Sequence, residues 1–293
     1  MKDAAHAESL EHEVFQKPFK VEPEFEYRDT PPNYHRRHLG EGKLPDKMKV
    51  WRVQDHSKVY GKIPNSVVAC AYGFTDSLDA EVLAKGFNTG KEYGAVGVGR
   101  HGNYLQWGYS LPPSKMTDAG RKFFLNCICY INKFDGKAPL IRRTSTHRLD
   151  TMRLARSAEA LWQRRKNDES FLPFIPEDLT KKFSGDPNGL VQYYKDNLEF
   201  IYRDRQFHID SELKSLGLNS NRSLDTLERL IGLLQDDTHA DTARRLLTRY
   251  TNQSFQSADD WKRWFEDNRD RIFFSDVGGY KFLVIPEGYL DKK

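Results

Sequence analysis

The chain has 293 residues, of which 38% are hydrophobic and 30% are charged. This balance is typical of a globular protein, excludes a disordered or fibrous chain, and leaves room for two ordinary domains. The formal net charge of +4 excludes a polyanion binder that works by bulk charge. No apolar run reaches about 18 residues, so we expect no membrane span. Acidic residues occupy positions 3, 8, 11 and 13, where a signal peptide would be apolar, so we expect none.

Residues 1–44 are expected to form an irregular segment after a short first helix. Pro18, Pro23 and Pro32 interrupt regular structure, because proline lacks a backbone donor and restricts the residue before it. Within this segment, residues 21–27 are expected to form an edge strand or to pack against the module that follows.

Residues 45–138 are expected to form a β-rich α/β module. Alternation of apolar and polar side chains predicts a half-buried strand over residues 48–54. A continuous apolar run predicts a fully buried strand over residues 66–74. Further strands, with a turn at residues 88–90, are expected over residues 81–87, 94–98 and 103–109.

A helix is expected after these strands, because apolar residues at positions 123, 124, 127, 128 and 131 recur at helical spacing. It carries two of the three cysteines, Cys127 and Cys129, which a helix places on different sides. The third, Cys70, stands in an apolar run. Their number and spacing fit neither a disulfide framework nor a set of metal ligands. We therefore expect small buried side chains and no metal site.

Residues 136–150 are expected to form a linker, and residues 146–293 a mostly helical module that ends in a β-hairpin. Apolar stripes at helical spacing cover residues 149–161, 190–201, 224–234 and 240–250. Residues 257–260 form a capping-box pattern that predicts the start of another helix. Apolar runs at residues 272–274 and 280–285 flank a turn sequence and predict the hairpin. The predicted fold class is therefore α+β, or α/β.

Residues 97–102 read GVGRHG, which matches the G-x-G-x-x-G fingerprint of dinucleotide sites. A strand precedes the motif as required, but the residues after it, NYLQWGY, are poor helix formers. No acidic residue follows about 20 positions on in a second strand. We therefore expect a strand, a tight turn and a second strand, with glycines supplying positive φ and no bound cofactor.

Four polar or aromatic residues gather beside this turn: Arg100, His101, Asn103 and Trp107. A guanidinium, an imidazole, an amide and an indole on one rim would hold an anionic or sugar-like ligand. These residues are therefore the candidate ligand-binding site. In the alternative interpretation, His101 and Asn103 cap turn amides and Trp107 packs in the core.

Other chemistries have little support in the sequence. Neither the G-x-S-x-G elbow nor the H-E-x-x-H zinc motif occurs, and no cation flanks Cys70 to activate its thiol. Residues 142–166 hold eight Lys and Arg side chains that would contact phosphates, but only Trp162 supplies an aromatic ring. We therefore do not expect nucleic-acid binding, and expect these cations to pair with the acidic first 30 residues.

Residues 86–134 resemble the closing part of a glutamine-amidotransferase-like domain of the trehalose-utilisation type. Such domains end with a strand, a Gly-Arg turn, a second strand and a helix bearing an asparagine, which is here Asn126. The family's nucleophilic cysteine has no counterpart, because Cys70 stands in VACAY. The resemblance thus implies a fold and not that activity. Residues 261–274 resemble segments after HEAT-type repeats in large bacterial extracytoplasmic proteins, which implies a larger parent protein in that compartment.

Two functional hypotheses follow from the sequence. The first is a non-catalytic binding or protein-interaction module of a larger bacterial protein, because no reactive constellation is present. The alternative is a hydrolase-like enzyme that acts on a polar small molecule or carbohydrate at a site around Arg100 and Trp107. The sequence identifies no partner beyond these classes.

Overall fold

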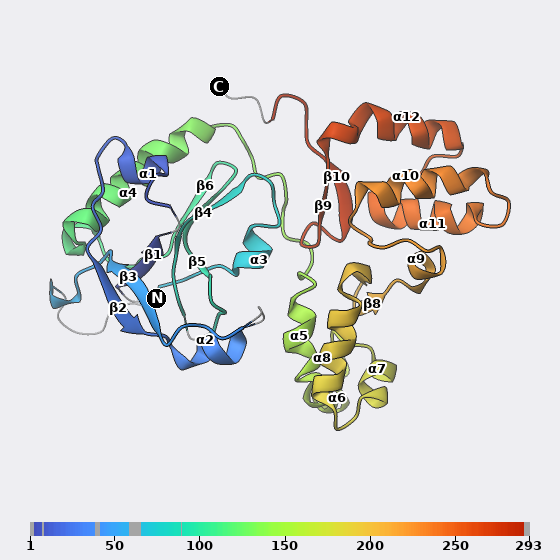
Figure 1. Cartoon of the computed structure of the whole chain (residues 1–293), viewed down its shortest axis with the longest axis horizontal. Coiled ribbons are helices and arrows are strands. Elements are labelled where there is room, and N and C mark those ends of the chain that lie inside the picture. The colour runs from blue at the N-terminus through green and yellow to red at the C-terminus, as the bar shows by residue number, and fades with distance from the viewer. Residues whose placement is uncertain (1–2, 8, 39–41, 59–65, 89, 290–293) are drawn as a thin grey trace. The chain divides into compact units, whose positions relative to one another are not determined.

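The computed structural model describes residues 3–7, 9–38, 42–58, 66–88 and 90–289. The chain divides into two compact units, Met1–Leu140 and Ile141–Lys292. The first unit contains a six-stranded antiparallel sheet, and the second contains helices and two short strand pairs (Figure 1). The predicted α+β class is therefore confirmed. None of the described helices combines the length and apolar character needed to cross a bilayer.

The sheet of the first unit has the strand order β2-β3-β1-β4-β5-β6. Its strands are β1 (Ala4–Ala7), β2 (Phe25–Asp29), β3 (Lys47–Arg52), β4 (Ala80–Lys85), β5 (Val96–His101) and β6 (Tyr104–Trp107). The strands expected at residues 48–54, 81–87, 94–98 and 103–109 are thus confirmed, with small shifts at their ends. The edge strand expected within residues 21–27 is confirmed as β2, which lies at one edge of the sheet.

The expectation that residues 1–44 are irregular is wrong for the part of the segment that the structure describes. It contributes α1 (Glu13–Gln16), α2 (Pro32–Arg37) and two strands. One of these strands, β1, lies inside the sheet, where it pairs with β3 through Ala4 and Ala5 and with β4 through His6 and Ala7. Four residues with three alanines show no strand pattern, so partners distant in the sequence decide this element.

The buried strand expected over residues 66–74 is also wrong. Its second half forms a short helix, α3 (Ala71–Phe74), and only Ala69 pairs with a strand residue, Val96. Val67, expected to be buried, is 68% exposed. A short apolar run does not distinguish a strand from a helical turn, and here the turn prevails. The turn expected at residues 88–90 includes Thr89, which lies outside the described residues.

The core of the first unit lies between the sheet and α4 (Asp118–Ile131), which runs beside α1 (Figure 1). Phe15 of α1 stacks on Phe123 of α4, with ring centroids 4.7 Å apart. This helix was expected from its apolar spacing. Cys127 is buried and Cys129 is exposed, so their placement on different sides is confirmed. The expectation that the cysteines are buried is wrong for Cys129, and Cys70 is only partly buried.

The second unit contains the helices α5 (Asp150–Ala155), α6 (Ala158–Asn167), α7 (Glu177–Lys182), α8 (Pro187–Asp196), α9 (Ser211–Ser215), α10 (Leu224–Gly232), α11 (Ala240–Thr251) and α12 (Ala258–Asn268). The capping box is confirmed, because the Ser257 hydroxyl accepts a hydrogen bond from the Asp260 amide. The closing hairpin is confirmed as β9 (Ile272–Ser275) and β10 (Lys281–Val284).

Two expectations for this unit need correction. The single stripe over residues 149–161 is divided into α5 and α6. The stripe over residues 190–201 ends early, because Ile201 begins a hairpin of β7 (Ile201–Arg203) and β8 (Phe207–Ile209). Ile201 is fully buried in β7, and an apolar residue is equally expected on the buried face of a helix, so its character did not reveal the change from helix to strand.

Candidate functional site

The glycine-rich motif forms a hairpin between β5 and β6, as the sequence predicts. His101 pairs with Tyr104 across a two-residue turn, and Gly102 in that turn has φ of +56°. A side chain at Gly102 would come within 2.7 Å of the Lys137 carbonyl oxygen. The motif therefore connects two strands and starts no helix that would hold a phosphate.

Arg100 and Trp107 point to the face of the sheet that α4 covers. Arg100 is 7% exposed, and its Nε lies 2.9 Å from Oε2 of Glu81. The Trp107 ring lies 5.7 Å from the ring of Phe123 in α4. Burial would raise the pKa of Glu81, but hydrogen bonds from Arg100 and Tyr130 hold it below its ordinary value. Arg100 and Trp107 thus both take part in packing inside the first unit.

His101 points to the opposite face, as successive residues of a strand do. Its ring lies 6.1 Å from Phe74 of α3, and its Nε2 lies 3.4 Å from an oxygen of Asp79. Asn103 occupies the turn itself. The structure therefore does not gather Arg100, His101, Asn103 and Trp107 into one cavity.

A pocket of about 490 Å³ opens elsewhere in the first unit, where β1 ends. The pocket lies beside Ala7, the last residue of β1, which pairs with β3 on one side and β4 on the other. Side chains from β1, β2, β3, β4 and the loop before β5 line this space. We call it the lysine pocket after the residues Lys47, Lys49 and Lys85 in its wall.

The wall of the lysine pocket is positively charged. Lys47 and Lys49 come from β3 and Lys85 comes from β4. No acid is among the described residues that line the pocket, and Asp29 lies opposite Lys47 in the pairing of β2 with β3. An anion bound beside the three ammonium groups would gain electrostatic free energy.

Aromatic side chains form the rest of the lysine pocket. The Lys49 ammonium lies 4.3 Å from the ring centre of Phe25, and the Lys85 ammonium lies 5.6 Å from that of Tyr93. These cation–π contacts hold the charged ends of both lysines beside ring faces. Tyr27, on the edge strand, is 70% exposed. A ligand in the pocket would therefore meet ammonium groups and flat apolar faces together.

One histidine borders the lysine pocket with a fixed ring orientation. Nδ1 of His6 lies 2.9 Å from the backbone carbonyl of Lys49. A carbonyl oxygen only accepts, so Nδ1 carries the proton in this contact. The contact also links β1 to β3 beyond their last paired residues, and it therefore fixes the wall at the mouth of the pocket.

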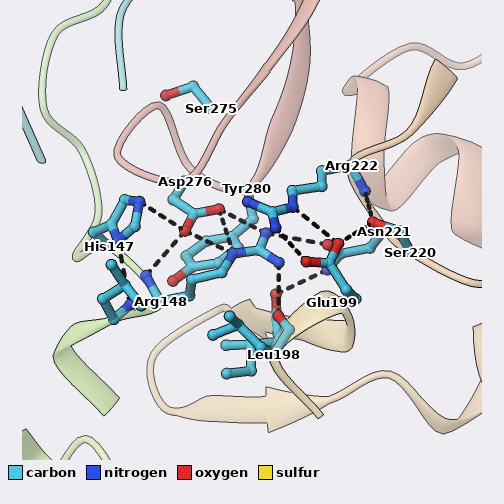
Figure 2. Close-up of polar contacts among 12 residues, drawn as sticks. His147, Arg148, Leu198, Glu199, Ser220, Asn221, Arg222, Ser275, Asp276 and Tyr280 are labelled. Carbon is cyan, nitrogen blue, oxygen red and sulfur yellow. Dashed lines mark hydrogen bonds and ion pairs between the residues drawn. The ribbon is translucent and has the colours of Figure 1, made fainter. Parts of the chain in front are cut away.

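A second polar cluster lies inside the second unit (Figure 2). The side chain of Arg148 is 1% exposed and forms a fork with the carboxylate of Asp276, with Nη2 to Oδ1 at 2.7 Å. Nη1 donates to the Leu198 carbonyl at 2.8 Å, and Nη2 also donates to Oδ1 of Asn221 at 3.1 Å. All three guanidinium nitrogens are therefore hydrogen-bonded, as a buried cation requires.

This cluster corrects the expectation for the basic stretch at residues 142–166. Arg148 pairs with Asp276 and Arg153 pairs with Asp150, rather than with the acidic N-terminus. Asp3, in the acidic N-terminus, pairs with Arg28 instead. These two cations of the basic stretch are therefore paired within the second unit.

None of the residues that line the lysine pocket was predicted as a site residue from the sequence. The alternation Lys47-Met48-Lys49 does place both lysines on one face of a strand, which is the one signal available. Lys85 comes close to them only because β1 lies between β3 and β4 and pairs with both strands. Among the residues that the structure describes, no three His, Cys, Asp or Glu side chains gather as a metal site would require.

Comparison with protein-family models, with curated proteins and with solved structures gave no significant match. The resemblance to an amidotransferase-like domain and to HEAT-type segments therefore stays a prediction. Function has to be argued from the geometry of the chain itself.

Proposed function

We propose that the first unit is a non-catalytic binding module for a small anionic ligand that carries a planar ring, such as a mononucleotide. One observation carries the proposal: Lys47, Lys49 and Lys85 line a single pocket together with the rings of Phe25 and Tyr93. Cations that converge on one cavity focus positive potential there. The pocket volume of about 490 Å³ suits a ligand of this size.

The aromatic side chains of the lysine pocket support the proposal that the ligand carries a planar ring. Lys49 and Lys85 each lie against a ring, so their ammonium groups stay near the pocket and do not extend into solvent. Tyr27 is exposed beside them and offers a flat face for stacking. A ligand with both an anion and a ring would use both kinds of surface, whereas an inorganic anion would use only one.

The make-up of the pocket favours binding over catalysis. Its described wall supplies cations and rings, and the His6 proton is engaged by a backbone carbonyl. General acid–base catalysis needs a titratable pair near the reacting atoms, and this wall supplies no such pair. The other candidate site residues, Arg100 and His101, lie on opposite faces of the sheet and add nothing to this pocket.

Isothermal titration calorimetry with adenosine 5′-monophosphate, adenosine and inorganic phosphate tests the proposal. We expect the monophosphate to bind more tightly than either adenosine or inorganic phosphate. We also expect its affinity to rise as the salt concentration is lowered. Loss of a charged hydrogen bond costs roughly 1.5–3 kcal/mol, so the double variant Lys47→Gln, Lys49→Gln should weaken binding by at least about tenfold.

The matched control is the double variant Lys17→Gln, Lys20→Gln. It changes the net charge of the same unit by the same amount at two exposed positions outside the pocket wall. We expect it to bind the monophosphate like the unmodified chain. Equal binding of adenosine and its monophosphate, or equal weakening by both double variants, would refute the proposal.

A further inference from the structure

The second unit contains a separate basic pocket of about 330 Å³. Its charged wall comes from three segments: Arg203 in β7, Arg249 at the end of α11, and Lys281 at the start of β10. Asp204 is the one acid among the described residues that line it. We call this cavity the hairpin pocket, because the turn before β10 closes one side of it.

The three cations of the hairpin pocket are not equally neutralised. Arg249 forms ion pairs with Asp210 at 2.7 Å and with Glu212 at 3.1 Å. Its charge is therefore balanced within the unit, and it forms a fixed side of the pocket.

Arg203 and Lys281 have only neutral partners in the described part of the chain. The guanidinium of Arg203 donates to the Ser145 hydroxyl at 3.3 Å and lies 4.9 Å from the ring centre of Phe174. The ammonium of Lys281 donates to the backbone carbonyl of Arg249. Neither cation forms an ion pair in the described part of the chain, and Asp204, the acid in the wall, contacts His208 instead. An anion in this small cavity would therefore gain electrostatic free energy from both cations.

The half-buried position of Lys281 strengthens this argument. Burial lowers the pKa of Lys281, and the neighbouring positive charge of Arg249 lowers it further. Both effects act against the charged amine. An anion in the pocket would act in the opposite direction and would stabilise the ammonium form.

The turn that carries Lys281 is held in an unusual backbone conformation. Tyr280, just before it, has φ of +59°, in the left-handed region that side chains rarely adopt. The Tyr280 hydroxyl donates to the Thr146 carbonyl at 2.8 Å. Asp276, at the start of the same turn, is held by Arg148, as Figure 2 shows. Backbone strain persists where its surroundings fix it, and such places are often binding sites.

We infer that the hairpin pocket binds a phosphate group, presented by a small phosphate monoester or by inorganic phosphate. Arg203 would supply a planar fork of donors and Lys281 a point charge, the two kinds of group that proteins use for phosphate oxygens. Because Asp276 and Tyr280 fix the turn in advance, binding requires little rearrangement of the chain. The inference does not depend on the lysine pocket, which belongs to the other unit.

Calorimetric titration of the full chain with inorganic phosphate, at constant ionic strength set by chloride, tests the inference. We expect saturable binding, which Lys281→Gln and Arg203→Gln each weaken at least tenfold. The control Lys262→Gln removes a cation that is 68% exposed on α12 of the same unit, and should bind phosphate like the unmodified chain.

Three results would overturn the inference: no saturable phosphate binding, unchanged binding in Lys281→Gln and Arg203→Gln, or the same loss in Lys262→Gln. If Lys281→Gln does not fold, Arg203→Gln decides the question alone. The double variant Lys47→Gln, Lys49→Gln should retain phosphate binding here, so failure of this site is distinguishable from failure of the lysine pocket. A parallel titration with glycerol phosphate distinguishes the two ligand sources. Tighter binding of glycerol phosphate than of inorganic phosphate indicates a monoester ligand, and the reverse order indicates the free ion.

Discussion

Replacing Arg148 by methionine removes a buried cation of the second unit and takes the guanidinium fork away from Asp276. The Asp276 carboxylate keeps the backbone amide of residue 148 at 2.9 Å and His147 Nε2 at 3.5 Å. Asp276 is 2% exposed, so its carboxylate cannot be rehydrated without opening the unit. The Leu198 carbonyl and the Asn221 side-chain oxygen also lose their donors. We therefore expect a large loss of stability that is confined to the second unit.

Breaking a buried ion pair by removing one partner costs about 3–5 kcal/mol. At roughly 2–4 °C per kcal/mol for a unit of this size, the melting temperature should fall by about 6–20 °C. The double variant Arg148→Met, Asp276→Leu should recover much of this loss, because it removes both charges and fills the space with apolar atoms. Recovery of this kind would show that the uncompensated charge causes the loss.

Differential scanning calorimetry and urea unfolding of the full chain measure these changes. The control is Arg263→Met, which removes a side chain that is 71% exposed and pairs with Asp260, itself 45% exposed. An exposed pair contributes at most about 1 kcal/mol, so this variant should differ little from the unmodified chain. If Arg148→Met costs no more than Arg263→Met, the reasoning about the buried network is refuted.

Further predictions concern the first unit and the helices. A side chain at Gly120 would lie 2.0 Å from the Val53 carbonyl oxygen, so Gly120→Ala should destabilise by about 1–3 kcal/mol or more in urea unfolding. Gly232→Ala meets no atom within 4 Å and should instead stabilise by up to about 1 kcal/mol; the opposite order of the two would contradict this packing. The pKa of Glu81 is lowered from 4.5 in the folded chain, so its ionised form stabilises the fold above that pH, and this contribution is lost as the pH falls through the folded pKa. Glu81→Gln should therefore weaken the acid dependence of the free energy of unfolding below about pH 4.5, and an unchanged dependence would count against the Glu81–Tyr130 contact.

Local signals predicted much of the fold. The β5–β6 hairpin follows from glycines beside a turn, and the start of α12 follows from the Ser257 capping box. The closing hairpin follows from two apolar runs around a turn sequence. In each case the residues that decide the structure lie within a few positions of one another, so the sequence displays them together.

The remaining features depend on contacts that are distant in the sequence. β1 is a strand because Ala4 meets Arg52 and Ala7 meets Ala84, and its own four residues contain no signal of this. The sequence likewise indicated a site at Arg100 because the polar residues there are adjacent, although strand alternation sends neighbours to opposite faces. The sequence did not indicate the lysine pocket, because Lys85 lies in β4 whereas Lys47 and Lys49 lie in β3.

Lysine acetylation of the native chain, measured by mass spectrometry, tests the central claim most directly, because it locates the bound ligand without any amino-acid substitution. We predict that adenosine 5′-monophosphate slows acetylation of Lys47, Lys49 and Lys85, that adenosine does so less, and that Lys20, which is 71% exposed, reacts at one rate throughout. Unchanged labelling of the three pocket lysines at saturating ligand, or equal slowing at Lys20, would contradict the account.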